Sequence, residues 1–278
     1  MQGSKIELAI DGSPSRRLWS SLRELLLFRS TILAFAERDI RVKYKQSVLG
    51  IAWAVIQPLA FMLVFTLTIG RIADVATGDV PYAAFSLSAL VPWTFLSTAV
   101  SFGANGVLSD AAMVRRVYFP REVPVLAGVA GTSVDFVIGL MLFSLIGPFL
   151  GAHVSVWWLV TPVLFVLLGA LAAAVAIPLA AMNVYYRDFR FAIPFALQLW
   201  LFASPVAYPL SVVSPDYRSL YVAMNPAAGI LDSFSAVLAE GTAPNLAYLG
   251  VSVLGTFVIG VLGYELFKRL EPNFADVI

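Results

Sequence analysis

The chain of 278 residues is 60% hydrophobic and only 13% charged, with a mean hydropathy of +0.86. Soluble domains carry roughly 25% charged residues, so this composition excludes an ordinary globular enzyme and indicates a protein embedded in lipid. The net charge of +1 points to no nucleic-acid partner, and the absence of cysteine excludes disulfides, thiolate nucleophiles and cysteine-bound metals.

A helix is predicted within residues 18–46, ahead of the first long apolar stretch. Apolar residues recur there at three- and four-residue spacing, while Arg38, Arg41 and Lys45 form a separate basic stripe. This pattern is typical of an amphipathic helix in the plane of the lipid headgroups, with its cations toward anionic lipid or a partner. A simple positive-inside anchor accounts for the same charges equally well.

Six apolar stretches, each long enough for a membrane-spanning helix of about 20 residues, make up most of the remaining chain. They cover residues 48–70, 80–109, 123–147, 155–186, 191–210 and 242–264. All lysines and arginines except Arg71 and Arg218 fall in segments that these spans would place on one side of a membrane. Because cytoplasmic loops carry the excess of Lys and Arg, we predict an all-α membrane protein with six spans and both termini in the cytoplasm. The N-terminus lacks the pattern of a cleaved signal peptide, so the first span is expected to direct insertion.

Two of the cytoplasmic loops resemble docking elements. In residues 106–122, a one- or two-turn helix is predicted, with Ser109 as its N-cap, Asp110 in its first turn and Pro120 at its end. Its mixture of apolar and basic side chains suits a groove on a soluble partner. The second loop, residues 185–191, is shorter and suits a smaller contact. Anchoring of both loops at the lipid boundary by snorkelling side chains is the alternative.

One carboxylate lies inside the third predicted span. Asp135 is about thirteen residues from the start of that span, or roughly 20 Å at 1.5 Å per residue. An ionised group at such a depth costs several kcal/mol unless it is paired or hydrated. Asp135 therefore either lies on a transport pathway or is protonated or hydrogen-bonded to Thr132, Ser133 or a hydroxyl on another span.

Residues 217–240 contain two apolar runs, each too short to cross about 30 Å of hydrocarbon, separated by Asn225 and Pro226. This pattern predicts a pair of re-entrant helices between the fifth and sixth spans. Such helices are tolerated at membrane depth only where they pack on protein or line a cavity. In that case they would frame the external end of a pore, and a surface-lying external loop is the alternative.

The sequence contains no phosphate-binding loop, no metal-spaced cluster and no hydrolase motif of the HExxH or GxSxG type. We therefore expect no catalytic residue, no metal and no bound cofactor, and this chain is not expected to hydrolyse ATP alone. His153, the only histidine, falls in an expected external loop and is assigned no role.

Several segments, in matching order, resemble the permease subunit of ABC-2 type polysaccharide exporters, which transport O-antigen, capsule and teichoic acid. They are ERDIRVKYKQSVLGIAWAVIQPLAFMLVFTLTIGRIADV (37–75), VPWTFLSTAV (91–100), VRRVYFPREVPVLAGV (114–129), NVYYRDFRFAIPFALQLWLFASPVAYPL (183–210), NPAAGILDSF (225–234) and EPNFADVI (271–278). The resemblance implies the channel-forming permease of an ATP-driven exporter that moves a lipid-linked polysaccharide. It further implies a homodimer that works with two copies of a separate ABC ATPase, which binds the ATP and Mg.

The resemblance also implies roles for individual residues. Coupling to the ATPase is expected of Ser109, Asp110, Met113, Val114, Arg115, Arg116, Val117 and Tyr118 in the first loop, and of Tyr186, Arg187 and Asp188 in the second. An external gate is expected at Asn225 and Pro226.

A polymer channel is implied between the first and fifth spans of both subunits. Aromatic faces suit such a channel because they stack on the apolar side of a sugar and form few directional bonds. The candidate channel residues are Trp53, Phe61, Phe65, Asp135, Trp200, Phe202 and Tyr208. Candidate cations for the pyrophosphate of a lipid carrier are Arg38, Arg41, Lys43 and Lys45. Ordinary packing of the aromatics and positive-inside anchoring by the cations are the alternatives.

The chain is divided into a cytoplasmic segment with the interface helix (1–46), a six-span permease domain (47–270) and a cytoplasmic tail (271–278), in the cytoplasmic membrane. Three alternatives stay open. One is an exporter of teichoic acid or a small amphiphile. A proton-coupled secondary transporter using Asp135 is another, although the internal repeat frequent in that class is absent from the sequence. An integral-membrane enzyme acting on lipid-linked sugars would require clustered carboxylates or histidines at one interface.

Overall fold

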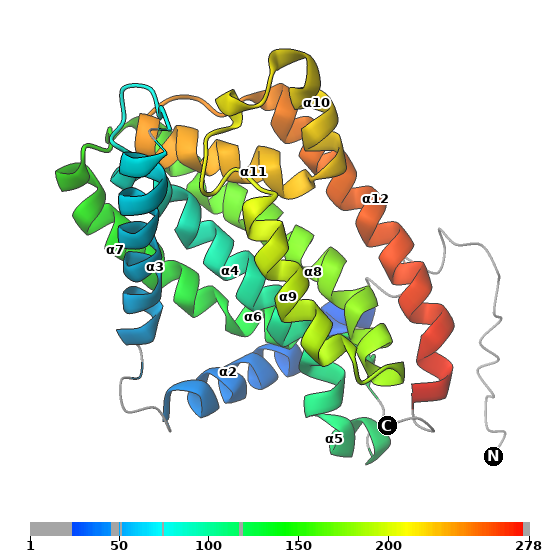
Figure 1. Cartoon of the computed structure of the whole chain (residues 1–278). Helices are drawn as coiled ribbons and strands as arrows, with labels where there is room; N and C mark the ends of the chain where they lie inside the picture. The colour runs from blue at the N-terminus through cyan, green and yellow to red at the C-terminus, as the bar shows by residue number, and fades with distance from the viewer. Residues whose placement is uncertain (1–23, 46–49, 51, 74, 117–118, 275–278) are drawn as a thin grey trace, which may run out of the picture.

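The computed structural model describes residues 24–45, 50, 52–73, 75–116 and 119–274, and every regular element in those ranges is helical. Figure 1 shows a bundle of long helices, with α2 lying across one end and α10 at the other. The helices are α2 (Arg29–Lys45), α3 (Ala52–Phe65), α4 (Tyr82–Ser109), α5 (Ala111–Arg116), α6 (Glu122–Gly131), α7 (Ser133–Ile146), α8 (Thr161–Tyr185), α9 (Phe189–Phe202), α10 (Pro215–Met224), α11 (Pro226–Ser235) and α12 (Leu246–Leu270). Short π-helical turns extend α3 (Thr66–Ile72) and α11 (Ala236–Glu240), and 3-10 turns form at Gly147–Leu150, Val156–Val160, Leu210–Val212 and Glu271–Asn273.

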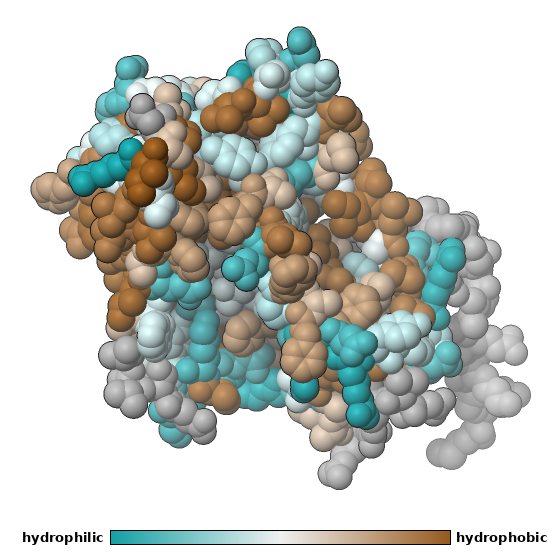
Figure 2. Space-filling model, viewed as in Figure 1, coloured by the Kyte–Doolittle hydropathy of each residue, from teal (hydrophilic) through white to brown (hydrophobic). Residues whose placement is uncertain are grey.

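Five of the six predicted spans correspond to helical segments that are long and apolar enough to cross a membrane. Among the described residues these are Ala52–Ile72, Tyr82–Ser109, Glu122–Leu150, Val156–Tyr185 and Leu246–Asn273. Apolar residues cover most of the middle of the face shown in Figure 2, and hydrophilic residues gather toward its two ends. The structure therefore confirms the expected all-α membrane fold.

The predicted fifth span is shorter than expected. Its helix, α9, has 14 residues, which is about 21 Å at 1.5 Å per residue. The helix ends at Phe202 because Pro205 disfavours helical backbone at the residue before it. By length, a sixth span is reached only when α10 and α11 are counted together.

α10 and the helix that follows it form a pair bent by 115°. Pro226 occupies the first turn of α11, where its missing N–H is not needed and its fixed φ suits a helix start. α11 is buried against α4, α8 and α12, whereas α10 is largely exposed. The predicted break at Asn225 and Pro226 is thus confirmed, and the burial of α11 fits a helix packed on protein better than a surface-lying loop.

α4 forms the centre of the bundle, because most of its side chains are buried and it packs against α3, α6, α7, α8, α9 and α11. Glycines bring α4 and α6 into backbone contact. A Cβ at Gly106 would lie 2.5 Å from the carbonyl oxygen of Pro124, and one at Gly128 would lie 2.9 Å from the backbone of Phe102. Small residues permit such close approach between membrane helices. The close backbone contact therefore holds α4 and α6 in a fixed arrangement.

Candidate functional site

α2 packs on α6 and inserts Phe35 and Ala36 into the core. The ring of Phe35 meets that of Phe119 edge to face, with centroids 5.9 Å apart. Leu33, on another face of α2, stays exposed. α2 is thus a separate helix across the end of the bundle (Figure 1), and its place at a membrane interface stays a prediction.

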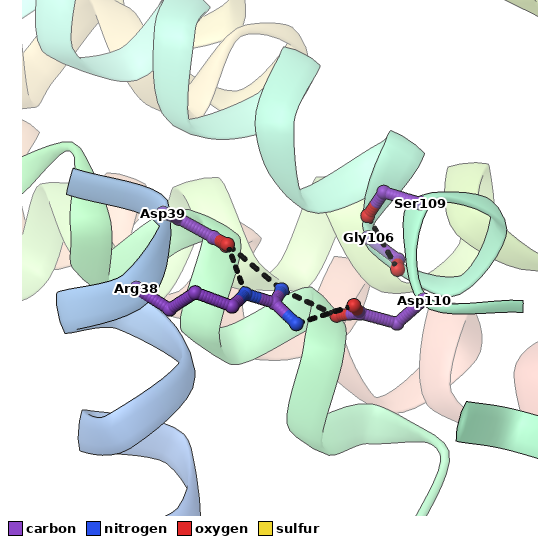
Figure 3. A network of polar contacts seen from close by, with 5 residues as sticks. All are labelled: Arg38, Asp39, Gly106, Ser109 and Asp110. Carbon is purple, nitrogen blue, oxygen red and sulfur yellow. Dashed lines mark hydrogen bonds and ion pairs between the residues drawn. The ribbon is translucent and has the colours of Figure 1, made fainter. Parts of the chain in front are cut away.

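Arg38 connects α2 to the end of α4 (Figure 3). Its Nη1 and Nη2 atoms donate to the two carboxylate oxygens of Asp110 at 2.6 and 2.9 Å. The same guanidinium donates to Asp39 at 2.8 and 3.0 Å. These hydrogen bonds, led by the one to Asp110, raise the pKa of Arg38 above its usual range. Bidentate pairing of this kind fixes geometry as well as charge.

The predicted cap of the first docking helix is wrong. Ser109 is the last residue of α4, and its hydroxyl donates to the carbonyl of Gly106 at 2.9 Å. Asp110 directly precedes α5, where its carbonyl accepts from the Met113 N–H at 2.9 Å, and its carboxylate is paired with Arg38. This ion pair could not be predicted from local sequence, since its partner lies 72 residues away.

The predicted short docking helix itself exists as α5. It contains Met113, Val114, Arg115 and Arg116, and the Met113 side chain is exposed. Val117 and Tyr118 lie outside the described residues. In the second loop Tyr186, Arg187 and Asp188 are all exposed. Both segments lie at the same end of the bundle as α2 (Figure 1).

Asp135 has partners that the sequence did not reveal. Thr132 separates α6 from α7, so Asp135 lies in the first turn of α7. Its carboxylate accepts hydrogen bonds from Lys43 and Tyr44 of α2. The hydroxyl of Thr132, one of the expected partners, donates instead to the carbonyl of Val129. Burial, followed by the bond to Asp135, raises the pKa of the Tyr44 phenol.

Lys43, Tyr44 and Asp135 form one wall of a cavity of about 290 Å³ among α2, α3, α4 and α7. We call it the Asp135 cavity. Its other polar and aromatic lining residues are Trp53, Gln57, Thr94, Phe95, Thr98 and Phe102. A carboxylate, a phenol, an amide and two hydroxyls thus face a space bordered by aromatic rings.

A second cavity of about 520 Å³ lies among α3, α4 and α9, and we call it the α3–α9 groove. It is lined by Phe61, Phe65 and Phe202, three of the predicted channel aromatics. The Phe65 and Phe202 rings are 6.3 Å apart. The groove and the Asp135 cavity share the lining residues Gln57, Thr94, Thr98 and Phe102.

Four hydroxyl side chains of α4 line the α3–α9 groove as a stripe. They are Thr94, Ser97, Thr98 and Ser101. Their spacing of three, one and three residues places them on one helix face. These four residues were not identified from the sequence, although hydroxyls at helical spacing inside an apolar span indicate a polar face on the helix.

The other predicted channel aromatics lie elsewhere. Trp53 lines the Asp135 cavity. Trp200 lines a separate, apolar cavity of about 290 Å³ among α4, α8 and α9, and its ring meets Trp93 edge to face at 5.8 Å. Tyr208 donates to the carbonyl of Phe202 at 3.1 Å and so closes the turn after α9. A channel role for Trp200 and Tyr208 stays a prediction.

Asn225, at the bend before Pro226, is tied to the end of α9. Its side-chain oxygen accepts from Trp200 Nε1 at 2.9 Å. Its side-chain nitrogen donates to the Ala203 carbonyl at 2.8 Å and to Ser204 Oγ at 2.9 Å. The residues expected to form an external gate therefore connect α9 to the α10–α11 bend.

Three of the four cations predicted for pyrophosphate binding are engaged inside the chain. Arg41 pairs with Glu37 on the same helix, Lys43 with Asp135, and Arg38 with Asp110 and Asp39. Lys45 is the last residue of α2. A pyrophosphate would have to compete with these carboxylates, so the predicted cluster is less available than its sequence indicates.

Long apolar helices around two adjoining, polar-lined cavities indicate a multi-pass membrane protein. The family described as ABC-2 type transporter matches residues 30–239. The chain belongs to this family, which confirms the resemblance found in the sequence.

Curated relatives match over nearly their full length. The chain is 28% identical over 258 residues to the O-antigen export system permease protein RfbA of Myxococcus xanthus, covering 92% of this chain and 98% of the relative. It is 21% identical over 248 residues to a protein of the same name from Klebsiella pneumoniae, covering 89% and 94%. It is 24% identical over 242 residues to the polysialic acid transport protein KpsM of Escherichia coli, covering 84% and 92%.

Proposed function

We propose that this chain is the channel-forming permease of an ATP-driven exporter that moves a lipid-linked polysaccharide across the cytoplasmic membrane. The observation that carries the proposal is the α3–α9 groove, which is lined by aromatic rings of α3 and α9 and by a stripe of hydroxyls on α4. The names of the full-length relatives, which concern O-antigen export and polysialic acid transport, support the substrate class.

A second copy of the chain would complete the pathway. The groove is open along one side, and the apolar residues Phe195, Leu199 and Phe202 of α9 and Leu63 and Val64 of α3 are exposed. In a homodimer these helices would face their counterparts and enclose a channel. Both termini would lie in the cytoplasm, on the side that bears α2, α5 and the α8–α9 turn.

The energy source would be a separate ABC ATPase, present in two copies and binding the ATP and Mg. α5 and the exposed turn at Tyr186, Arg187 and Asp188 would contact it, because both project from the same end of the bundle. The lipid pyrophosphate would enter near α2. Lys45 would make the first contact, and Arg38, Arg41 and Lys43 would join only by leaving their present partners.

Two alternatives are less well supported. A proton-coupled secondary transporter would use Asp135 as its proton site. The carboxylate of Asp135 is instead paired with Lys43 and Tyr44, so it connects α7 to α2. Teichoic acid or a small amphiphile as substrate is compatible with the groove but is favoured by no particular residue.

The test is co-expression of the full chain with a polysaccharide-exporter ATPase, followed by purification through a tag on the permease. We expect a complex that hydrolyses ATP. Met113→Asp should release the ATPase because it places a charge on the exposed apolar edge of α5. Val212→Asp, at a still more exposed apolar position at the other end of the bundle, is the control and should retain it. Failure of the folded wild type to bind any such ATPase would overturn the proposal.

A further inference from the structure

The Asp135 cavity combines chemical groups that recognise sugars. Carbohydrate hydroxyls pair with carboxylates, amides and hydroxyls, and the apolar face of a sugar ring packs on aromatic side chains. Asp135, Tyr44 and Gln57 supply the first kind of group, and Trp53 and Phe102 supply the second. The volume of about 290 Å³ is at the lower end of the range for small-molecule sites, roughly 300–1,000 Å³.

The position of the cavity connects it to the proposed transport path. Gln57, Thr94 and Thr98 line both the cavity and the α3–α9 groove, so a chain lying in the groove can place one unit in the cavity. The charges are balanced there, because Lys43 is paired with Asp135. A neutral, hydroxyl-rich ligand fits such a site better than a phosphate does.

We propose that the Asp135 cavity is a subsite for one sugar unit of the exported polymer, with Thr94, Thr98 and Gln57 as its shared border with the groove. This inference rests on the proposed export function. Trp53 provides the stacking surface, and the Asp135 carboxylate and the Tyr44 hydroxyl oxygen accept hydrogen bonds from sugar hydroxyls at the far wall. Because Tyr44 and Lys43 belong to α2, a shift of α2 would change the shape of the subsite.

The natural absence of cysteine allows a direct test, because a single introduced cysteine is the only thiol in the chain. Thr98→Cys is labelled with a charged methanethiosulfonate in membranes from cells that make the polymer and from cells that lack its synthesis. We expect labelling to be about fivefold slower with polymer present, as for a site occupied four-fifths of the time. Ala54→Cys, at a position that lines the Asp135 cavity but not the α3–α9 groove, is a second reporter, and we expect it to be protected in the same way.

Ala76→Cys, in an exposed loop before α4, is the control and should react equally in both membranes. Equal labelling of Ala54→Cys in both membranes, whether or not Thr98→Cys is protected, in cells that still export polymer, would overturn the subsite but not the export function. That result would also be obtained if a phospholipid headgroup filled the cavity. Undiminished export after deletion of this chain would instead overturn the proposed function.

A second measurement distinguishes the loss of a contact with sugar from a loss of protein stability. Thr94→Val with Thr98→Val should reduce the export rate about fivefold for each hydroxyl that contacts sugar, as one lost hydrogen bond implies. The thermal unfolding of the purified permease should be unchanged. Thr256→Val, on α12 away from both cavities, is the matched control and should export normally. An export rate equal to the control would overturn the proposal.

Discussion

Arg38 of α2 and Asp110, which directly follows α4, form a bidentate ion pair across 72 residues of sequence, with N–O distances of 2.6 and 2.9 Å (Figure 3). Asp110 is also the residue directly before α5. The same contact therefore fixes α2 to the base of the helix proposed to meet the ATPase. A continuous set of side-chain contacts thus runs from the start of α5 to α2, and through Lys43 and Tyr44 to Asp135.

Asp110→Asn is expected to lower the free energy of unfolding by about 1–3 kcal/mol, because it leaves a charged hydrogen-bonding partner unmatched. Arg38 keeps Asp39 as a second partner, so the loss should stay in that range. The measurement is thermal unfolding of the purified full chain in detergent. Glu37→Gln is the control, since the Glu37–Arg41 pair is exposed and such pairs contribute roughly 0–1 kcal/mol. Equal shifts for both variants would show that the Arg38–Asp110 pair is dispensable.

A buried carboxylate ties α6 to α12 at the same end of the bundle. Glu122 is fully buried, and its Oε1 atom accepts from Lys268 at 2.6 Å and from Tyr264 at 2.9 Å. Lys268 also reaches Glu271 at 2.7 Å.

Glu122→Ala should be more damaging than Asp110→Asn, with a loss of about 3 kcal/mol, because it breaks a fully buried pair and leaves Lys268 with Glu271 alone. Tyr264→Phe removes one hydrogen bond and should cost about 1 kcal/mol. Unfolding of the two variants in parallel checks the order. A Glu122→Ala protein as stable as Tyr264→Phe would mean that Glu271 alone is enough to pair Lys268.

Features of the fold that depend on local residue patterns were predicted from the sequence. The lengths of the apolar stretches predicted five spans, and the Asn225–Pro226 pair predicted the break before α11. The contacts of Asp135 and Asp110 could not be predicted in the same way, because their partners in α2 are brought near only by the packing of α2 on α6. The cap assigned to Ser109 failed for a local reason, since α4 continues through Ser109 and its hydroxyl donates to the carbonyl of Gly106. The length of α9 was overestimated because the sequence stays apolar to residue 210, whereas the helix ends at Phe202, ahead of Pro205.

The bend between α10 and α11 should be sensitive to Asn225. Asn225→Ala removes the three hydrogen bonds to Trp200, Ala203 and Ser204, so we expect a loss of about 2–3 kcal/mol at roughly 1 kcal/mol each. Trp200→Phe removes only one of these bonds and should cost about 1 kcal/mol from that source. Unfolding curves and export rates of both variants are the measurement. If Asn225→Ala affects neither quantity, the bend is held by the burial of α11 alone.

Closure of the α3–α9 groove by a second copy of the chain can be tested by cross-linking introduced cysteines, because the chain has no native cysteine. Phe195 and Leu254 are both large, exposed and apolar, with exposed fractions of 65% and 63%, but they lie on α9 and α12. If α9 faces its counterpart in a homodimer, Phe195→Cys should be joined to a second chain by a short bis-maleimide, and Leu254→Cys should not. The readout is the dimer band on a denaturing gel of the detergent-solubilised protein. Cross-linking through Leu254→Cys alone would place the interface on α12, and the groove would then need a different cover.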